Sequence, residues 1–132
     1  MKKKIMVDMS ATLIHYGHIR LIKKAKKYGN LIIGLTTDKQ VKKYKGYFPE
    51  LSYKFRKEIL SEIKGVNKVV PSDWLITQKF LDKHKIDILI SGSDHKNRDF
   101  KTKTINFNRT KNVSSTKLRM KSAKIIKKKY EK

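Results

Sequence analysis

Short apolar runs alternate with helical patterns along all 132 residues, and this alternation most constrains the fold. The runs at 5–9, 31–36, 66–71 and 86–90, with a weaker one at 104–107, predict strands. Apolar residues at helical spacing predict helices over 16–28, 52–65 and 76–84 and from about 114 onward, with Ser52 as a helix cap. Strands and helices in strict alternation are typical of an α/β fold with a mainly parallel sheet.

No repeat, linker or second domain interrupts this pattern, so residues 1–132 are expected to form a single domain. Periodicity fades over 38–51, where lysines accumulate beside Gly46 and Pro49, which predicts a mobile loop or a broken helix. The basic tail, residues 121–132, is expected to fray.

Composition leaves the charge as the main bulk signal. The chain has no cysteine and no apolar run long enough to cross a bilayer, so a cytoplasmic protein without a membrane anchor is expected. Its 34 Lys+Arg against 11 Asp+Glu give a formal charge of +23. Lysines such as Lys23, Lys24, Lys26 and Lys27 fit the solvated face of a helix, yet the same charge would attract a triphosphate or a nucleic acid. Charge alone does not separate these explanations.

Two histidines stand where such a fold places its ligand. In open α/β sheets the site lies beyond the carboxyl ends of the strands. His15 and His18 directly follow the first predicted strand and open a helix, so a spacing of three puts both imidazoles on one face. Gly17 between them permits close approach of another group, and the helix start offers free N–H donors to a phosphate. A pair of surface histidines or half of a metal site is the alternative.

The segment His15-Tyr16-Gly17-His18 resembles the HxGH signature of the nucleotidyltransferase superfamily. Residues 109–116, RTKNVSST, resemble the RTEGISTT element of glycerol phosphate type cytidylyltransferases. The resemblance covers residues 4–119 and implies a Rossmann-like doubly wound parallel sheet of about five strands, with flanking helices, in a homodimer. Residues 9–15, MSATLIH, also resemble cytidylyltransferases that activate aminoalkylphosphonates.

The resemblance implies transfer of CMP from CTP to a small phosphate or phosphonate, such as glycerol 3-phosphate or 2-aminoethylphosphonate, with release of pyrophosphate. Because such an acceptor is already anionic, the enzyme must align reactants and stabilise charge. The implied catalytic residues are His15, His18, Lys45 and Arg109. The implied nucleotide-binding residues are Met9, Ser10, Gly17, Asp94, Arg109, Thr110, Ser114, Ser115 and Thr116. Arg56, Lys64 and Trp74 are expected at the acceptor, and Mg²⁺ is expected with CTP, through unknown ligands.

The chain departs from the family pattern at three places. Thr12 stands where the family has Asp, which removes a carboxylate expected near the triphosphate or its metal. Ser93 and His95 flank Asp94 in place of a GDDW type element. Lys111 and Asn112 replace Glu and Gly in the later motif, where they are expected to alter how the nucleotide is read.

Two other functions stay open on the sequence. An adenylyltransferase of the same superfamily would use ATP. A basic nucleic-acid-binding module on a degenerate transferase fold would explain the charge, although no basic stripe or stacking platform supports it. The acceptor is not fixed by these residues either.

Overall fold

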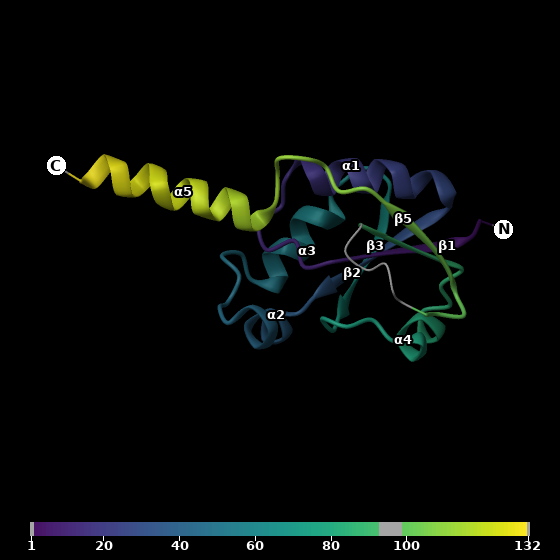
Figure 1. Cartoon of the computed structure of the whole chain (residues 1–132). Helices are drawn as coiled ribbons and strands as arrows, with labels where there is room; N and C mark the ends of the chain where they lie inside the picture. The colour runs from purple at the N-terminus through teal and green to yellow at the C-terminus, as the bar shows by residue number, and fades with distance from the viewer. Residues whose placement is uncertain (1, 93–98, 132) are drawn as a thin grey trace.

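A single parallel sheet forms the centre of the protein. In the computed structural model, which describes residues 2–92 and 99–131, five strands pair in parallel in the order β3-β2-β1-β4-β5 (Figure 1). The strands are β1 (Lys4–Met9), β2 (Asn30–Thr36), β3 (Val66–Ser72), β4 (Ile88–Gly92) and β5 (Lys103–Phe107). The predicted single-domain α/β fold is confirmed.

Helices connect the strands and cover both faces of the sheet. They are α1 (Tyr16–Ala25), continued by the 3₁₀ turn η1 (Lys26–Tyr28), α2 (Asp38–Lys45), α3 (Tyr53–Ser61), α4 (Gln78–Lys83) and α5 (Ser115–Tyr130). Of the two alternatives for 38–51, the structure has a helix that breaks. The hydroxyl of Thr37 caps α2, and Gly46, with φ 83°, ends it in the left-handed conformation that favours glycine.

Side chains alternate between two cores because successive strand residues point to opposite faces of the sheet. Val7 and Ile33 pack under α1 and α3 in one cluster, whereas Met6, Ile32 and Leu89 pack against the α4 side in the other. Both faces are thus buried, which explains why the strands have continuous apolar runs. The sheet is doubly wound as the sequence predicts.

Helix α5 is the exception to this packing. It projects away from the sheet (Figure 1), and residues 121–130 are exposed along their whole length. They are helical to Tyr130, so fraying of the tail in solution stays a prediction. Within the described residues, the protein has no helix long and apolar enough to cross a bilayer.

The strand order places a crevice beside β1. The chain runs outward from β1 through β2 to β3, then crosses back to β4 on the other side of β1. At such a switch point the connections leave the carboxyl ends of the two neighbouring strands in opposite directions, which opens a ligand site between them. The loop after β1 carries the histidine pair to this place.

Candidate active site

The two histidines form a reciprocal cap at the start of α1. His15 is the residue that caps the helix, and its Nδ1 accepts the N–H of Gly17 at 3.0 Å. The Nδ1 of His18 reaches back and accepts the N–H of His15 at 3.1 Å. Since each Nδ1 is an acceptor, the proton of each neutral ring lies on Nε2. The spacing of three thus fixes both imidazoles by the backbone, with ring centroids 4.0 Å apart.

Gly17 is needed here for space. A Cβ at this position would lie 2.8 Å from His15 Cε1 and 3.2 Å from Val113 Cγ1, closer than van der Waals contact. The imidazole of His15 can therefore fold over the helix start only above a glycine. This close approach gives a physical reason for the glycine of the motif.

Both histidines are held neutral at physiological pH. Burial lowers the pKa of His18 to about 3, and the nearby His15 and Arg109 push this pKa in the same direction. Burial, followed by the charge of Arg109, also lowers the pKa of His15. Neutral rings of this tautomer offer Nε2–H as a hydrogen-bond donor at pH 7 without a charge of their own.

The start of α5 docks on the loop that precedes the histidines. The hydroxyl of Ser114 caps α5 and accepts the N–H of Lys117 at 3.0 Å. Ser115 Oγ donates to the carbonyl of Leu13 at 2.9 Å and lies 3.2 Å from its N–H. Two segments about a hundred residues apart are thereby joined, as the resemblance requires, so the histidine cap and the start of α5 lie at one site.

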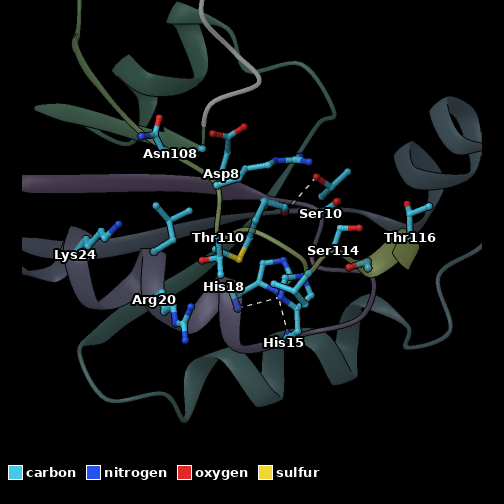
Figure 2. Close-up of a pocket in the computed structure, with 18 of the residues that line it drawn as sticks. Asp8, Ser10, His15, His18, Arg20, Lys24, Asn108, Thr110, Ser114 and Thr116 are labelled. Atoms are coloured by element: carbon cyan, nitrogen blue, oxygen red, sulfur yellow. Dashed lines mark hydrogen bonds between the residues drawn. The ribbon is translucent and has the colours of Figure 1, made fainter. Parts of the chain in front are cut away.

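A pocket of about 530 Å³ lies between these elements. Figure 2 shows His15, His18, Ser114 and Thr116 around it. Twelve residues expected at the site line this pocket: Met9, Ser10, His15, Gly17, His18, Lys45, Trp74, Arg109, Thr110, Ser114, Ser115 and Thr116. Both sequence motifs thus face one cavity, as expected.

An aromatic wall bounds the pocket on the side of α2. The rings of Trp74 and Tyr44 stack, with centroids 5.5 Å apart and planes 11° from parallel. Gln40 Oε1 accepts the N–H of Trp74 at 3.1 Å, and Lys45 Nζ lies 5.8 Å from the centre of the Trp74 ring. Lys45 is therefore placed at the pocket mouth by the last turn of α2.

Five polar side chains line the pocket that the predicted site did not include: Asp8, Arg20, Lys24, Thr36 and Asn108. Arg20 and Lys24 lie four residues apart on α1, beyond His18, and Asp8 lies near the end of β1 (Figure 2). The interpretation of Lys24 as an ordinary solvated lysine is incomplete, because its exposed side chain also faces the site. Spacings of three and seven from Gly17 put both cations on the face of the helix that carries the motif, and this was the signal that could have found them.

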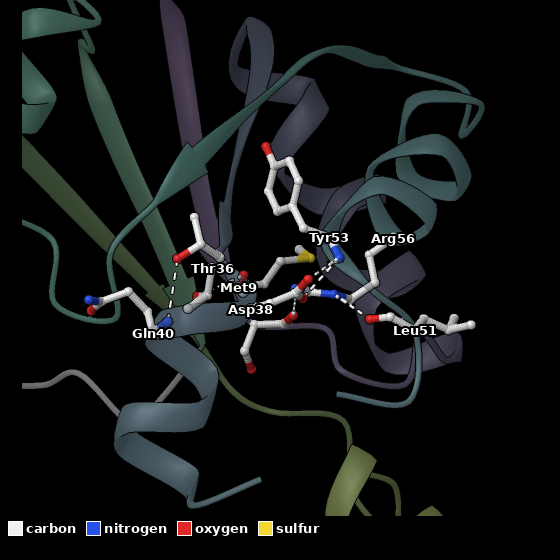
Figure 3. Close-up of polar contacts among 9 residues, drawn as sticks. Met9, Thr36, Asp38, Gln40, Leu51, Tyr53 and Arg56 are labelled. Carbon is white, nitrogen blue, oxygen red and sulfur yellow. Dashed lines mark hydrogen bonds and ion pairs between the residues drawn. The ribbon is translucent and has the colours of Figure 1, made fainter. Parts of the chain in front are cut away.

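Arg56 does not line the pocket, so its predicted contact with the acceptor is wrong. The side chain is fully buried. Its guanidinium donates to Leu51 O at 3.0 Å, to Ser10 O at 2.6 Å and to Asp38 Oδ1 at 2.7 Å (Figure 3). The Asp38 carboxylate also accepts the N–H of Tyr53, so it caps α3. A buried arginine held at three points is a structural group that supports the loop after β1.

One further expectation is confirmed in part, one is not supported and one lies outside the described residues. Ser52 is the N-cap residue of α3, as predicted, but its side chain makes no capping hydrogen bond; the Asp38 carboxylate accepts the N–H of Tyr53 instead. Lys64 is exposed near the amino end of β3, at the opposite edge of the sheet from the pocket, so its contact with the acceptor is not supported. Asp94 falls in 93–98, outside the described residues.

Two of the departures from the family pattern have structural explanations, whereas Ser93 and His95 lie outside the described residues. Thr12 is fully buried and does not line the pocket. Its replacement of the family's Asp therefore removes no carboxylate from the pocket wall. Asn112 adopts a left-handed conformation with φ 68°, which glycine and asparagine tolerate best. The replacement of Gly by Asn112 therefore preserves the turn before α5.

Comparisons with known proteins agree with this geometry. Residues 10–121 match the model of the cytidylyltransferase-like family. The chain is 33% identical over 125 residues to the glycerol-3-phosphate cytidylyltransferase of Staphylococcus aureus, covering 89% of this chain and 92% of that protein. It is 32% identical over 125 residues to the enzyme of the same name from Bacillus subtilis, covering 89% and 95%. The crystal structure of a lipopolysaccharide core biosynthesis protein from Thermoplasma volcanium superposes with a TM-score of 0.72 at 22% identity, covering 83% of this chain and 99% of that one.

Proposed function

Because the chain belongs to the cytidylyltransferase-like family of nucleotidyltransferases, we propose that it transfers CMP from CTP to a small phosphate or phosphonate acceptor and releases pyrophosphate. The observation that carries this proposal is one cavity lined both by the histidine cap of α1 and by the hydroxyl-rich start of α5. The imidazole Nε2–H groups of the cap and the start of α5 provide the donors that a triphosphate needs. Family membership also favours the transferase over the nucleic-acid-binding alternative.

In the reaction, an anionic oxygen of the acceptor attacks the α-phosphorus of CTP. The new P–O bond forms as the bond to the bridging oxygen of pyrophosphate breaks, and that oxygen leaves with the electron pair. No strong base is needed, since the nucleophile carries its charge at neutral pH. The protein has to align the reactants and stabilise charge on the phosphoryl oxygens.

The neutral histidines suit this task. His15 and His18 donate Nε2–H to the phosphoryl oxygens and hold them while charge builds. Their positions are fixed before the ligand arrives by the N–H groups of Gly17 and His15. Such preorganised donors cost no rearrangement in the transition state and are typically worth about 3 kcal/mol each in the barrier.

Fixed cations and hydroxyls complete the nucleotide site. Arg109 and Thr110 contact the leaving phosphates, and Lys45 adds charge from the end of α2. Met9, Ser10 and Gly17 approach the nucleotide through their backbone, and the first turn of α5, residues 114–116, donates to its phosphates. Arg20 and Lys24 extend the same cationic wall along α1.

Glycerol 3-phosphate is the first acceptor to test, because it is the acceptor named for the relatives matched over most of their length. Trp74 stays our candidate at the acceptor, and 2-aminoethylphosphonate is the second compound. Homodimerisation is also proposed, since Met120, Ile125, Ile126 and Tyr130 leave apolar surface exposed on α5.

Mg²⁺ fits this site as a substrate-borne ion. Mg²⁺ is usually held by one or two carboxylates together with substrate phosphates, and Asp8 is the carboxylate lining the described part of the pocket. No group of three or more metal-ligating side chains occurs among residues 2–92 and 99–131. When bound, the ion would neutralise charge on the triphosphate, and Asp8 is the residue placed to hold it.

The direct test incubates the protein with Mg²⁺, either CTP or ATP, and a panel of small phosphates and phosphonates. We expect CDP-glycerol or a CMP–phosphonate conjugate by mass spectrometry, with pyrophosphate released in equal amount. His18→Asn is the matched variant, because an asparagine can keep the contact with His15 N–H while lacking Nε2. It should slow turnover about a hundredfold. Preference for ATP would refute the nucleotide assignment, and normal turnover in the variant would remove His18 from the mechanism.

A further inference from the structure

Arg119 joins three segments beside the pocket without lining it. It lies on α5, one turn beyond the residues that open the helix. Its Nε donates to Glu50 Oε2 at 2.5 Å and its Nη2 to Glu50 Oε1 at 2.6 Å, a two-point pair. Nη1 donates to the hydroxyl of Tyr47 at 2.8 Å, and Nη2 also donates to Thr12 Oγ1 at 3.2 Å. We call Arg119, Glu50, Tyr47 and Thr12 the clasp.

Each partner in the clasp belongs to a segment that carries site residues. Thr12 lies in the loop between β1 and the histidine cap. Tyr47 and Glu50 follow Lys45 directly after α2 ends at Gly46. Arg119 itself belongs to the helix whose first turn lines the pocket. The clasp therefore ties the loop after β1, the segment after Lys45 and the start of α5 to one guanidinium.

Little else fixes the direction of α5. Its residues 121–130 are wholly exposed, and the bonds between Ser115 and Leu13 hold only its first turn. A helix held at its first residue alone can pivot, whereas a bidentate pair one turn later removes that freedom. The guanidinium also lies over the Tyr47 ring, 4.7 Å from its centre, and this contact limits movement of Arg119 away from the ring.

We propose that Arg119 is a positioning residue that orients the nucleotide-binding start of α5 and the Lys45 segment across the pocket, with Glu50 as its counter-charge. This inference rests on the proposed function, since it assigns the first turn of α5 to the triphosphate. When the clasp is loosened, the chemical step is unchanged, but the start of α5 must become ordered as CTP binds. This ordering costs free energy and lowers the affinity for CTP.

The geometry also explains why position 12 tolerates a neutral residue. Thr12 Oγ1 touches the same Nη2 that pairs with Glu50, so a carboxylate at position 12 would face the guanidinium directly. In this chain the neutral Thr12 stands at that place, and Glu50 supplies the carboxylate. We therefore expect an aspartate at position 12 to replace Glu50 as the counter-charge of the clasp.

Steady-state kinetics of four variants test the clasp. Arg119→Gln and Glu50→Gln should raise KM for CTP about tenfold, the equivalent of 1.4 kcal/mol, while KM for the acceptor and kcat at saturating CTP stay within about threefold. Thr12→Asp combined with Glu50→Gln should return KM for CTP to within about threefold of wild type. The same Thr12→Asp combined with Arg119→Gln should not. Lys121→Gln, exposed on the same helix, and Glu58→Gln, exposed on α3, are the matched controls.

A merely structural role would lower Tm and kcat together and leave the ratio of the two KM values unchanged, and that result would overturn the proposal. An unchanged KM for CTP in Arg119→Gln would overturn it as well. Failure of Thr12→Asp to rescue would refute the exchange of counter-charge.

Amide hydrogen exchange over residues 114–118 gives a readout without activity: Arg119→Gln should speed exchange there at least about tenfold, and Lys121→Gln should not. If the wild-type protein turned over no acceptor, the proposed function would be refuted. The hydrogen-exchange result would still show whether Arg119 holds the start of α5.

Discussion

The lowered pKa of His18 makes folding stability depend on pH in a way that can be calculated. The unfolded chain should titrate this imidazole near 6.5, whereas burial lowers its pKa in the fold to about 3. Between these values the unfolded state binds a proton that the folded state rejects, so stability falls as pH drops through this window. The contribution is fully present above pH 6.5 and is lost progressively toward pH 3.

From those two values, lowering the pH from about 7.5 to about 5 should cost the free energy of unfolding about 2 kcal/mol through His18 alone. The assay is urea unfolding at both pH values for wild type and for His18→Asn, without nucleotide. Because asparagine does not titrate, the loss in the variant should be smaller by about 2 kcal/mol. The lowered pKa of His84 contributes in both proteins and cancels in the difference.

Equal pH dependence of the two proteins would refute the reasoning, because it would mean that His18 titrates alike in the folded and unfolded chains. A direct check is the nitrogen NMR spectrum of the imidazole. At pH 5 it should show neutral His18 with its proton on Nε2, as the contact between Nδ1 and His15 N–H requires. A protonated ring at pH 5 would refute the assignment independently of any unfolding measurement.

Three other substitutions test separate parts of the fold and site. Gly17→Ala should lower kcat at least about tenfold by displacing the His15 ring, since the added Cβ would lie 2.8 Å from it; unchanged kcat would contradict the steric role. Arg56→Ala should cost about 3–5 kcal/mol in urea unfolding, because Asp38 loses its buried partner; a stable variant that lost only acceptor affinity would restore the ligand assignment. Tyr53→Phe should change the free energy of unfolding by less than about 0.5 kcal/mol, since the buried hydroxyl has no hydrogen-bond partner within the described structure; a loss above about 1 kcal/mol would reveal a missed contact.

The histidine cap was predictable because it depends on local spacing. Once the first strand and the helix after it are predicted, the start of that helix must lie at the carboxyl end of the sheet, together with His15, Gly17 and His18. The convergence with Ser115 was predictable for the same reason, since the last helix also starts after a strand of the same parallel sheet. Hydrophobic periodicity, together with the rule that ligands bind beyond the carboxyl ends of parallel strands, was sufficient to predict both features.

Arg56 shows where such reasoning fails. A pattern of residue types does not distinguish an arginine that binds a ligand from one that binds its own chain. The partners of Arg56 are a carboxylate 18 residues away and a carbonyl 46 residues away, and they become visible only in three dimensions. Lys24 failed in the opposite direction: among several lysines on a basic helix, only its spacing from Gly17 distinguishes it as a residue that faces the pocket.

The site contains two kinds of polar group: cations that attract anions, and neutral histidines whose donor directions are fixed. In the proposed function, Arg20, Lys24, Lys45 and Arg109 supply the positive potential that draws a triphosphate in. His15 and His18 add no charge, yet each ring is fixed by a backbone N–H, so its Nε2–H direction is set by the helix start. Burial among cations keeps the histidines neutral, and neutrality leaves Nδ1 free to accept that backbone bond. If the proposed function holds, the same cationic surroundings that attract the substrate also preserve the alignment of the donors that act on it.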